Sequence, residues 1–574
     1  MASLTAKRIK GRTYYYLREC QRVDGKPKIV RQTYIGPADE VAAALEKQPT
    51  ALKVLPESPV FDFGAEAALL DLARELEVVD IVDRHVPRRG SRGTSVGTCL
   101  LIAALNRCVK PTSKAGIGAW FDRTCLPRLM KVSASQLTSQ RFWDQMDRVD
   151  EAAIQRIEEE LTRRVIDTFD LDLDCLFYDA TNFFTFFDTF NGRSKLAQRG
   201  KSKEGRSSLR ILGLAMLVTG EFHVPLLHRV YPGNQPDAPT FRSLIEDLVE
   251  RHRLLTDGVL DLTLVFDKGN NAADTIASVA DSPWHFVGSL VPTQHDDLLA
   301  HDADELPQLD TEVFPDRLRA RRLKKTVFGR EFTVLITFNP ALFEAQTRTI
   351  ERELAKRQVK LEKYRQYTER WRRGEGAGAR AGRRPTVKGT NKAVARILTG
   401  RHMKELFDVS VKPDPDADGL PILRYKIDDA AYQNLRSTLL GKTLLFTDRD
   451  DWSDEKIVLA YRGQHHVEDA FRQMKDVAHV SFRPVHHWTD QKVRVHALCC
   501  VIALLLASLL NKRLADRGLR MSIDKMFETL GTIREIHTLT SSGRGRPRTH
   551  RGTSRLDDDA RRVHDALDLG RYLK

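Results

Sequence analysis

The chain has few cysteines for its length, and none of them lies in a Cys-x-x-Cys pair. There are seven among 574 residues, at positions 20, 99, 108, 125, 175, 499 and 500, without regular spacing. Paired metal-binding cysteines are therefore not indicated. Several of these cysteines stand in apolar runs, and we expect buried free thiols, which suit a reducing cytoplasm.

No secretion or membrane signal is present either. The N-terminus, MASLTAKRIKGR, is basic but lacks the apolar core of a signal peptide. The one long apolar run, from Ala497 to Leu510, is too short to cross a bilayer comfortably and predicts a buried helix. We expect a cytoplasmic protein that does not enter a membrane.

The composition is that of a soluble globular protein with an excess of positive charge. Hydrophobic residues make up 41% and charged residues 30%, which excludes global disorder. The length predicts three or four structural units. Lys and Arg total 92 against 78 Asp and Glu, for a net charge of +14, so a polyanionic partner is plausible on charge alone.

Three acidic residues in three different settings carry the chemistry that we predict. Asp179 lies inside the apolar, strand-like run LDCLFYDATNFF, Asp267 ends the run LTLVFD, and Glu468 stands in a helical pattern. A carboxylate in an apolar run is costly unless it has a partner. Carboxylates brought together from distant segments suit a pair of Mg²⁺ or Mn²⁺ ions, which can clamp both the attacking and the leaving oxygen of a phosphodiester.

Each of these acids also has an ordinary structural explanation. An Asp at a strand end, such as Asp267, is most often a turn or helix-cap residue, and Glu468 is placed to pair with Arg472 one helical turn away. Asp179 is harder to explain in this way. The three together, in this order on a strand, strand and helix pattern, favour a catalytic centre.

A predicted helix from Tyr461 to Lys475 places several polar residues on the face of Glu468. Residues three, four or seven positions apart share one face of a helix, so this face also carries Tyr461, Gln464 or His465, and Lys475. The ammonium group of Lys475 suits a phosphate contact. His465 and His466 beside Glu468 lack the His-Glu-x-x-His spacing of a zinc site. His486, His487 and Trp488 are interpreted as packing or backbone contacts.

The coarse pattern predicts five regions. Asp24-Gly25 between two β-rich runs predicts a hairpin over 13–35, which either contacts nucleic acid or docks on the rest of the chain. Helical spacing dominates 58–168, with a candidate DNA-binding or packing helix in SASQLTSQRFWDQMDRV, and mixed strands and helices follow. The predicted division is an N-terminal basic hairpin region (1–57), a helical DNA-binding or dimerisation domain (58–168), a catalytic α/β domain (169–300 and 441–515), an insertion (301–440) and a basic C-terminal tail (516–574).

These motifs resemble bacterial insertion-sequence transposases of the DDE class, in the insertion-sequence-four superfamily. That group carries a signature around its glutamate. A Tyr is followed after two residues by an Arg, after three more by the Glu, and after six more by a Lys. Tyr461, Glu468 and Lys475 fit this spacing, whereas Gln464 occupies the Arg position, for which Arg462 or His465 is the candidate substitute. The resemblance extends over about 170–515 and includes Asp179-x-Thr181, Gly233-Asn234-x-x-Asp237 and Asp267-Lys268-Gly269.

The resemblance implies an RNase H-like mixed α/β fold with a β-rich and helical insertion between the second Asp and the Glu. It implies catalytic and metal-binding roles for Asp179, Asp267 and Glu468, with two Mg²⁺ ions that Mn²⁺ can replace. DNA contacts are implied for Tyr461, Gln464, Lys475, Arg462 and Lys268. The implied substrates are the terminal inverted repeats of an element and a double-stranded target. A homodimer is the implied assembly, and a bacterial, nucleoid-associated location the implied setting.

Two other functions use the same features. One is a DNA-binding protein derived from a transposase whose centre no longer cuts, and the other is a metal-dependent nuclease without strand transfer. The basic segments 372–388 and 544–555 are candidate phosphate contacts or solvated charge.

Overall fold

We describe a computed structural model of the chain, which covers residues 2–23, 26–47, 53–54, 59–86, 93–186, 192–200, 209–236, 239–247, 261–376, 383–541 and 548–574. The contacts divide the chain into two compact units. The first is Met1–Ala68, Phe121–Lys131 and Phe527–Lys574, and the second is Leu69–Trp120 and Val132–Met526. Each unit is described by itself.

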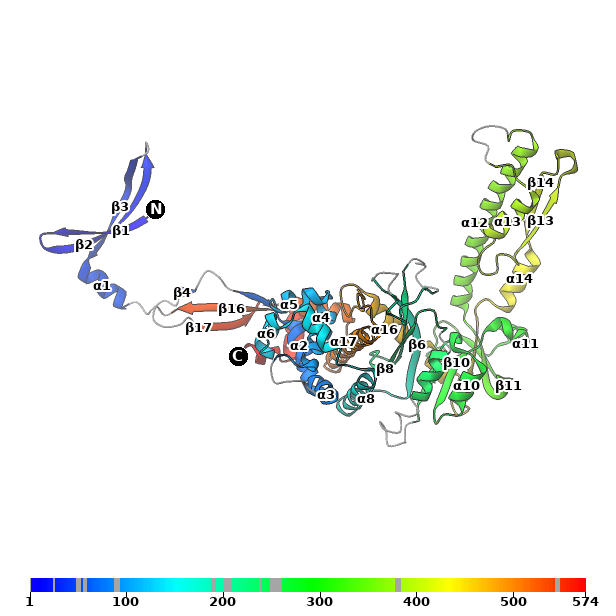
Figure 1. The fold of residues 1–574 in the computed structure, drawn as a ribbon, viewed down its shortest axis with the longest axis horizontal. Helices are drawn as coiled ribbons and strands as arrows, with labels where there is room; N and C mark the ends of the chain where they lie inside the picture. The colour runs from blue at the N-terminus through cyan, green and yellow to red at the C-terminus, as the bar shows by residue number, and fades with distance from the viewer. Residues whose placement is uncertain are drawn as a thin grey trace. The chain divides into compact units, whose positions relative to one another are not determined.

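The second unit is built on an eight-stranded mixed sheet in the order β11-β12-β15-β10-β9-β6-β7-β8 (Figure 1). Its strands are β6 (Cys175–Phe184), β7 (Ile211–Val218), β8 (Pro225–Pro232), β9 (Thr263–Val265), β10 (His285–Ser289), β11 (Arg319–Val327), β12 (Arg330–Phe338) and β15 (Lys442–Thr447). Strand β9 runs parallel to both β6 and β10, and the other neighbours are antiparallel. The predicted mixed α/β architecture is confirmed.

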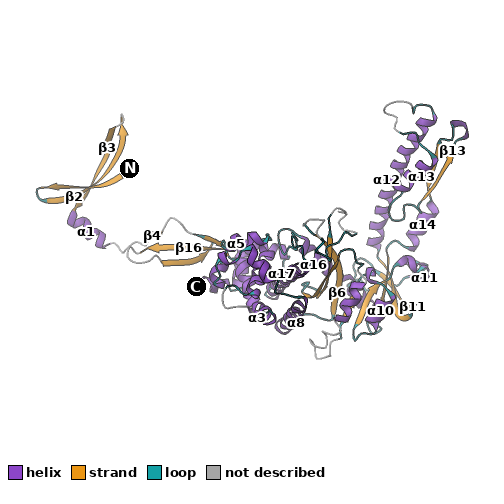
Figure 2. Cartoon of the chain, viewed as in Figure 1, coloured by secondary structure: helices purple, strands orange, loops and turns teal. Residues whose placement is uncertain are grey.

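The helices of this unit lie beside the sheet or, as α12, α13 and α14 do, extend away from it (Figure 2). They are α3 (Val78–His85), α4 (Val96–Val109), α7 (Ser139–Met146), α8 (Glu151–Thr168), α10 (Ala273–Ala280), α11 (Asp296–Leu299), α12 (Pro340–Arg372), α13 (Val387–Ile397), α14 (Asp429–Thr438), α15 (Asp454–Arg462), α16 (His465–Lys475) and α17 (Asp490–Asp516). Residues 239–247 are also helical.

Helix α17 is the centre of the helical core. It is the one described helix that is long and apolar enough to cross a membrane, yet 94% of its apolar window is buried inside the protein. It packs against α4, α8, α16 and β8. A helix that is apolar on every side is expected in such an interior, so the predicted buried helix is confirmed.

The segment 301–440, which we expected to form an insertion, contributes two strands to the sheet. Strand β12 pairs antiparallel with β15 in a register that sets Thr337 opposite Thr443, and β11 continues the sheet beyond β12. The part outside the sheet begins at α12. This helix packs against β14 (Pro421–Ile427), which pairs with β13 (Phe407–Pro413), while α13 packs against β13 (Figure 1).

Helix α12 is long and strongly charged, and local interactions stabilise it. The Asn339 side chain caps its first turn by accepting from the Leu342 amide, and Pro340 occupies the first helical position. Its buried residues, Ile350, Leu354, Leu361 and Thr368, form one narrow stripe. Ion pairs such as Arg357 with Glu353 lie along its length.

The first unit contains two small sheets. Strands β1 (Ala2–Ile9), β2 (Arg12–Val23) and β3 (Lys26–Pro37) form one, followed by α1 (Ala38–Lys47). The antiparallel β2–β3 pair confirms the predicted hairpin, although the Asp24-Gly25 turn lies outside the described residues, and β1 was not predicted.

The described residues of the C-terminal region 516–574, which we expected to be a basic tail, form strands and helices. Strand β16 (Arg534–Ser541) pairs with β17 (Arg548–Thr553), β4 (Lys53–Val54) and β5 (Val60–Asp62), and α19 (Asp558–Ala566) and a 3₁₀ helix (Leu569–Leu573) follow. Buried Glu535 receives a hydrogen bond from Arg128, at 2.9 Å, in α6 (Leu126–Met130). Three further helices lie on or across the boundaries between the units: α2 (Gly64–Glu75), α5 (Lys114–Phe121) and α18 (Ile523–Thr532).

Candidate active site

Asp179 lies in β6, and Asp267 lies two residues beyond the end of the neighbouring parallel strand β9. The β6–β9 register sets Phe177 opposite Val265, and each aspartate lies two residues further along its own chain. Side chains alternate between faces with a period of two, and the backbone of Asp267 is still extended, so this register predicts that both carboxylates lie on the same face of the sheet. Both residues are half-buried.

Asp267 is held by two hydroxyl groups from other elements. The Ser289 hydroxyl, at the end of β10, donates to Oδ1 of Asp267 at 3.1 Å. The Tyr461 hydroxyl of α15 donates to the same oxygen at 3.1 Å and lies 2.9 Å from Ser289 Oγ. Burial and then the charge of Asp267, with a smaller effect of Glu468, raise the pKa of Tyr461 above its ordinary value. The Tyr461 hydroxyl therefore stays protonated and remains a donor to the carboxylate.

The predicted single helix from Tyr461 to Lys475 is wrong, because the chain forms two helices there. Helix α15 ends at Arg462 and α16 begins at His465. A Cβ on Gly463 would lie 2.5 Å from the Phe177 ring of β6, so glycine permits this junction to sit directly on the strand. Glu468 consequently lies in the first turn of α16 rather than in the middle of a helix.

Gln464 is part of the protein interior. Its side chain is buried, and its amide nitrogen donates to the Tyr178 carbonyl of β6 at 2.9 Å. Our predicted DNA contact for Gln464 therefore needs correction: its amide ties the α15–α16 junction to the strand that carries Asp179.

Lys475 also lies over β6, beyond Asp179. Its ammonium donates to the Thr181 hydroxyl at 2.7 Å and lies 5.8 Å from the centroid of the Phe183 ring. The Asp179-x-Thr181 motif and Lys475, distant in sequence, thus belong to one cluster. Arg462 instead binds Asp316 at 2.7 Å and lies over the Phe314 ring.

The donor chemistry of the two aspartates fits a hard divalent cation, since both offer carboxylate oxygens at neighbouring positions. Glu468 is exposed on α16. Among the residues that the structure describes, no group of three or more His, Cys, Asp and Glu side chains is close enough to hold a metal ion. The register thus sets Asp179 and Asp267 at equivalent positions along β6 and β9, and Glu468 is exposed on α16 without completing a three-carboxylate group among the described residues.

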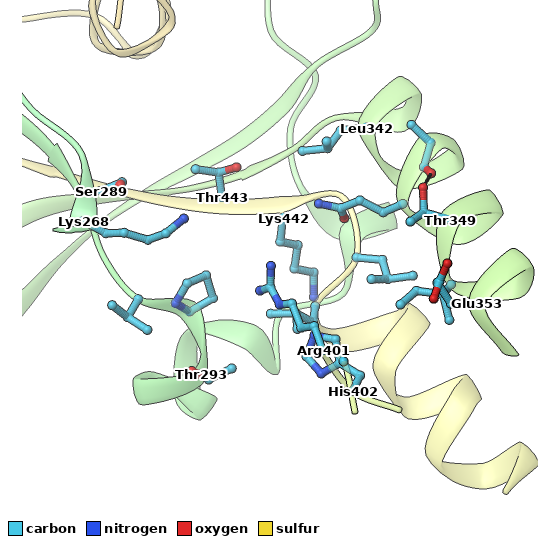
Figure 3. Close-up of a pocket in the computed structure, with 18 of the residues that line it drawn as sticks. Lys268, Ser289, Thr293, Leu342, Thr349, Glu353, Arg401, His402, Lys442 and Thr443 are labelled. Carbon is cyan, nitrogen blue, oxygen red and sulfur yellow. Dashed lines mark hydrogen bonds between the residues drawn. The ribbon is translucent and has the colours of Figure 1, made fainter. Parts of the chain in front are cut away.

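A cavity of about 600 Å³ begins beside Asp267 and extends to the helical part outside the sheet. Lys268, Ser289 and Tyr461 line one end, and Arg401 and Lys442 line another part. Figure 3 shows Lys268 reaching into the cavity from the sheet side and Thr349 and Glu353 facing it from α12. Lysine and arginine outnumber acidic groups in its wall, which favours an anionic occupant.

The sequence interpretation missed three contributors to this site. Ser289 carries a usable signal, because it ends a strand-like run next in order after that of Asp267. Gly463 and Phe177 carry none, because their contact depends on how α15 and α16 pack on β6.

Of the Gly233-Asn234-x-x-Asp237 motif, Asp237 lies outside the described residues, and a Cβ on Gly233 would collide with the Ile211 carbonyl.

His466 anchors α16 from its buried side, and its ionisation predicts a pH dependence. Burial, followed by the charges of His465 and His223, lowers the pKa of His466 to about 4. The unfolded chain, with a histidine pKa of about 6.5, binds more protons between pH 6.5 and 4, so stability falls as the pH falls through this window. Because the ring is only partly buried, the expected effect is moderate. When the pH is lowered from 7 to 5, the free energy of unfolding of His466→Gln should fall by about 1 kcal/mol less than that of the wild type.

Urea unfolding at the two pH values measures this difference. Buried His487, whose pKa is lowered to about 2, contributes equally in both proteins and cancels. Equal losses of stability in wild type and variant would show that His466 titrates normally in the folded chain.

The comparisons with known proteins bear on this same segment. Residues 171–506, more than half of the chain, match the model of the family described as "Transposase DDE domain". The chain belongs to the transposase DDE domain family. The matched segment includes Asp179, Asp267 and Glu468, together with the whole of the sheet. No curated protein matches the chain.

One solved structure resembles this transposase distantly. It is the cryo-EM structure of a piggyBac transposase synaptic complex with hairpin DNA, at 9% identity, 83% coverage of this chain, 82% coverage of that chain and a TM-score of 0.35. A likeness of this size supports no statement about individual residues.

Proposed function

We propose that this transposase cuts the ends of a mobile DNA element and joins the freed 3′-hydroxyl to target DNA. The observation that carries the proposal is the matched register of Asp179, in β6, and Asp267, just beyond the parallel strand β9, inside the segment that matches the family. We assign the element to the bacterial insertion-sequence-four superfamily, on the Tyr461, Glu468 and Lys475 spacing, and the catalytic fold to the RNase H-like class.

Asp179 and Asp267 would hold Mg²⁺ or Mn²⁺, and Glu468 would supply a third carboxylate. Two such ions, when bound, neutralise the charge that develops on the attacking and leaving oxygens of a phosphodiester. Ser289 and Tyr461 fix the carboxylate of Asp267 through their hydroxyl groups, so its orientation is set before DNA arrives. The junction at Gly463 holds α16, and with it Glu468, on β6.

The DNA backbone would approach along the basic cavity beside Asp267. Lys268 and Arg401 are exposed and line it, and a strand lying there would place a phosphate next to the two aspartates. Lys475 would hold the strand on the other side of Asp179. Action as a homodimer on paired ends, in the bacterial cytoplasm, completes the proposal.

A cleavage and joining assay tests this function. The full-length protein is incubated with Mg²⁺ or Mn²⁺, a labelled duplex carrying the repeats that flank the gene, and an unlabelled target duplex. Metal-dependent nicks together with labelled joined products are the expected result. Nicks without joined products would indicate a nuclease, and binding without either product would indicate a DNA-binding protein that no longer cuts.

A further inference from the structure

The N-terminal sheet β1–β3 is strongly basic and exposed. Residues 1–37 contain nine Lys and Arg against two acidic residues. Among its described residues, only Gly36 is buried, and large apolar side chains such as Leu17, Ile29 and Tyr34 are 40% to 53% exposed. Helix α1 packs against β2 and β3, but most side chains of this small sheet stay exposed or half-buried, so a partner surface is expected.

One face of this sheet carries aromatic, basic and amide side chains together. The register sets Lys7 opposite Tyr14, Tyr16 opposite Tyr34, and Arg18 opposite Gln32, all on the same face because β2 alternates with a period of two. The contacts confirm this placement: the Tyr16 and Tyr34 ring centroids are 5.4 Å apart, and the Lys7 ammonium lies 5.6 Å from the Tyr16 centroid.

Arg18 and Gln32 form an ordered pair on this face. The Arg18 Nε donates to the Gln32 side-chain oxygen at 2.8 Å. This bond aligns the two long side chains and uses neither the Gln32 amide nitrogen nor the terminal guanidinium nitrogens, which are further hydrogen-bond donors. Arginine pairs with guanine O6 and N7, and glutamine with adenine N6 and N7, both in the major groove.

The tyrosines favour duplex DNA over a single strand. A single strand needs open aromatic faces on which bases can stack. Here Tyr14 and Tyr16 are half-buried, both contact Tyr34 with tilted rings, and Lys7 covers the Tyr16 ring. The rings therefore form a stiff support for polar side chains. The excess of positive charge also disfavours pairing with a second copy of the same sheet.

We propose that this face of β1–β3 enters the major groove and reads base edges at the ends of the element. Arg18 and Gln32 contact bases, while Lys7 contacts a phosphate. The inference rests on the proposed function for the identity of the DNA. It adds the binding mode and the residues that select the sequence, in a unit separate from the candidate active site.

Competition binding with the full-length protein tests this inference. The dissociation constants for a repeat duplex and a scrambled duplex are measured at one salt concentration. Arg18→Ala and Gln32→Ala should each lower the preference for the repeat by about tenfold, the effect of losing one bidentate base contact. Lys7→Ala should weaken both duplexes by the same factor and reduce the salt dependence. Arg31→Ala is the matched control, since it removes the same charge from the opposite face, where Arg31 stands opposite Glu19, and should leave the preference unchanged.

Methylation interference is a second measurement, and its first part uses only the wild type. Methylation of guanine N7, a major-groove atom, should block binding at particular guanines of the repeat, and this interference should disappear at the guanine read by Arg18 in Arg18→Ala. Unchanged preference and unchanged interference in both variants would overturn the inference, as would a preference for single-stranded repeat DNA. A wild type that never prefers the repeat would instead contradict the proposed function itself.

Discussion

Asp267→Asn is expected to reduce strand cleavage by about a thousandfold or more, while DNA binding stays within about twofold of the wild type. Asparagine keeps the shape of the side chain, and its oxygen still accepts from Ser289 and Tyr461, so the local structure is preserved. The negative charge needed to hold a divalent cation is lost. A bound cation supplies several kcal/mol of transition-state stabilisation, which corresponds to a loss of this size.

Asp179→Asn should give the same phenotype, because both aspartates belong to one centre. The double variant should be no slower than either single variant, since residues that act as a unit are strongly non-additive. Asp281→Asn is the matched control: it removes a carboxylate from an exposed pair with Arg330 and should cut normally. Cleavage rates under single-turnover conditions, together with binding by fluorescence anisotropy, separate the two effects. Normal cleavage by Asp267→Asn would remove this residue from the site.

Gly463→Ala is expected to destabilise the second unit by about 1–3 kcal/mol and to reduce cleavage at least tenfold. The new methyl group would lie 2.5 Å from two carbons of the Phe177 ring, so α16 must shift away from β6. Glu468, Gln464 and Lys475 all depend on that contact for their position above the strand. A shift of about 1 Å in a positioning element is costly for catalysis.

The rescue of this variant makes the prediction specific. Phe177→Leu removes the outer ring carbons that the methyl group meets, so Gly463→Ala with Phe177→Leu should recover part of both stability and cleavage. Gly531→Ala, at a helical glycine with open space around it, should leave stability unchanged or slightly raised. Urea unfolding and cleavage rates provide the readouts. If Gly463→Ala retains full stability and full cleavage, the close contact does not position α16.

Local patterns were enough to predict most elements of this transposase. The apolar runs around Asp179 and Asp267 became β6 and β9, and the apolar run from Ala497 became the buried helix α17. In each case the period of the hydrophobic residues and the flanking turns determine the element. The candidate site was predicted from the combination of three acidic residues on a strand, strand and helix pattern, because a carboxylate at the end of an apolar strand is, alone, most often a turn or helix-cap residue.

The pairings between strands from distant segments of the chain could not be predicted from the sequence. Strand β12 joins the main sheet through β15, which lies outside the segment 301–440, so part of the segment that we expected to be an insertion belongs to the main sheet. Strand β16 pairs with β5 from the other end of the chain, and β17, which contains residues 548–553 of the basic segment, pairs with β16. The break between α15 and α16 follows from packing on Phe177, whereas the helical pattern itself continues through Gly463.

The most direct test of the central claim, that Asp179 and Asp267 form one metal-binding centre, is a Mn²⁺ titration followed by electron paramagnetic resonance. It compares the DNA-bound wild type with Asp179→Asn, Asp267→Asn and the Asp281→Asn control. We predict Mn²⁺ binding in the wild type and the control, and at least a tenfold weaker affinity in each of the two site variants. Equal Mn²⁺ affinity in all four proteins would contradict the assignment of this centre.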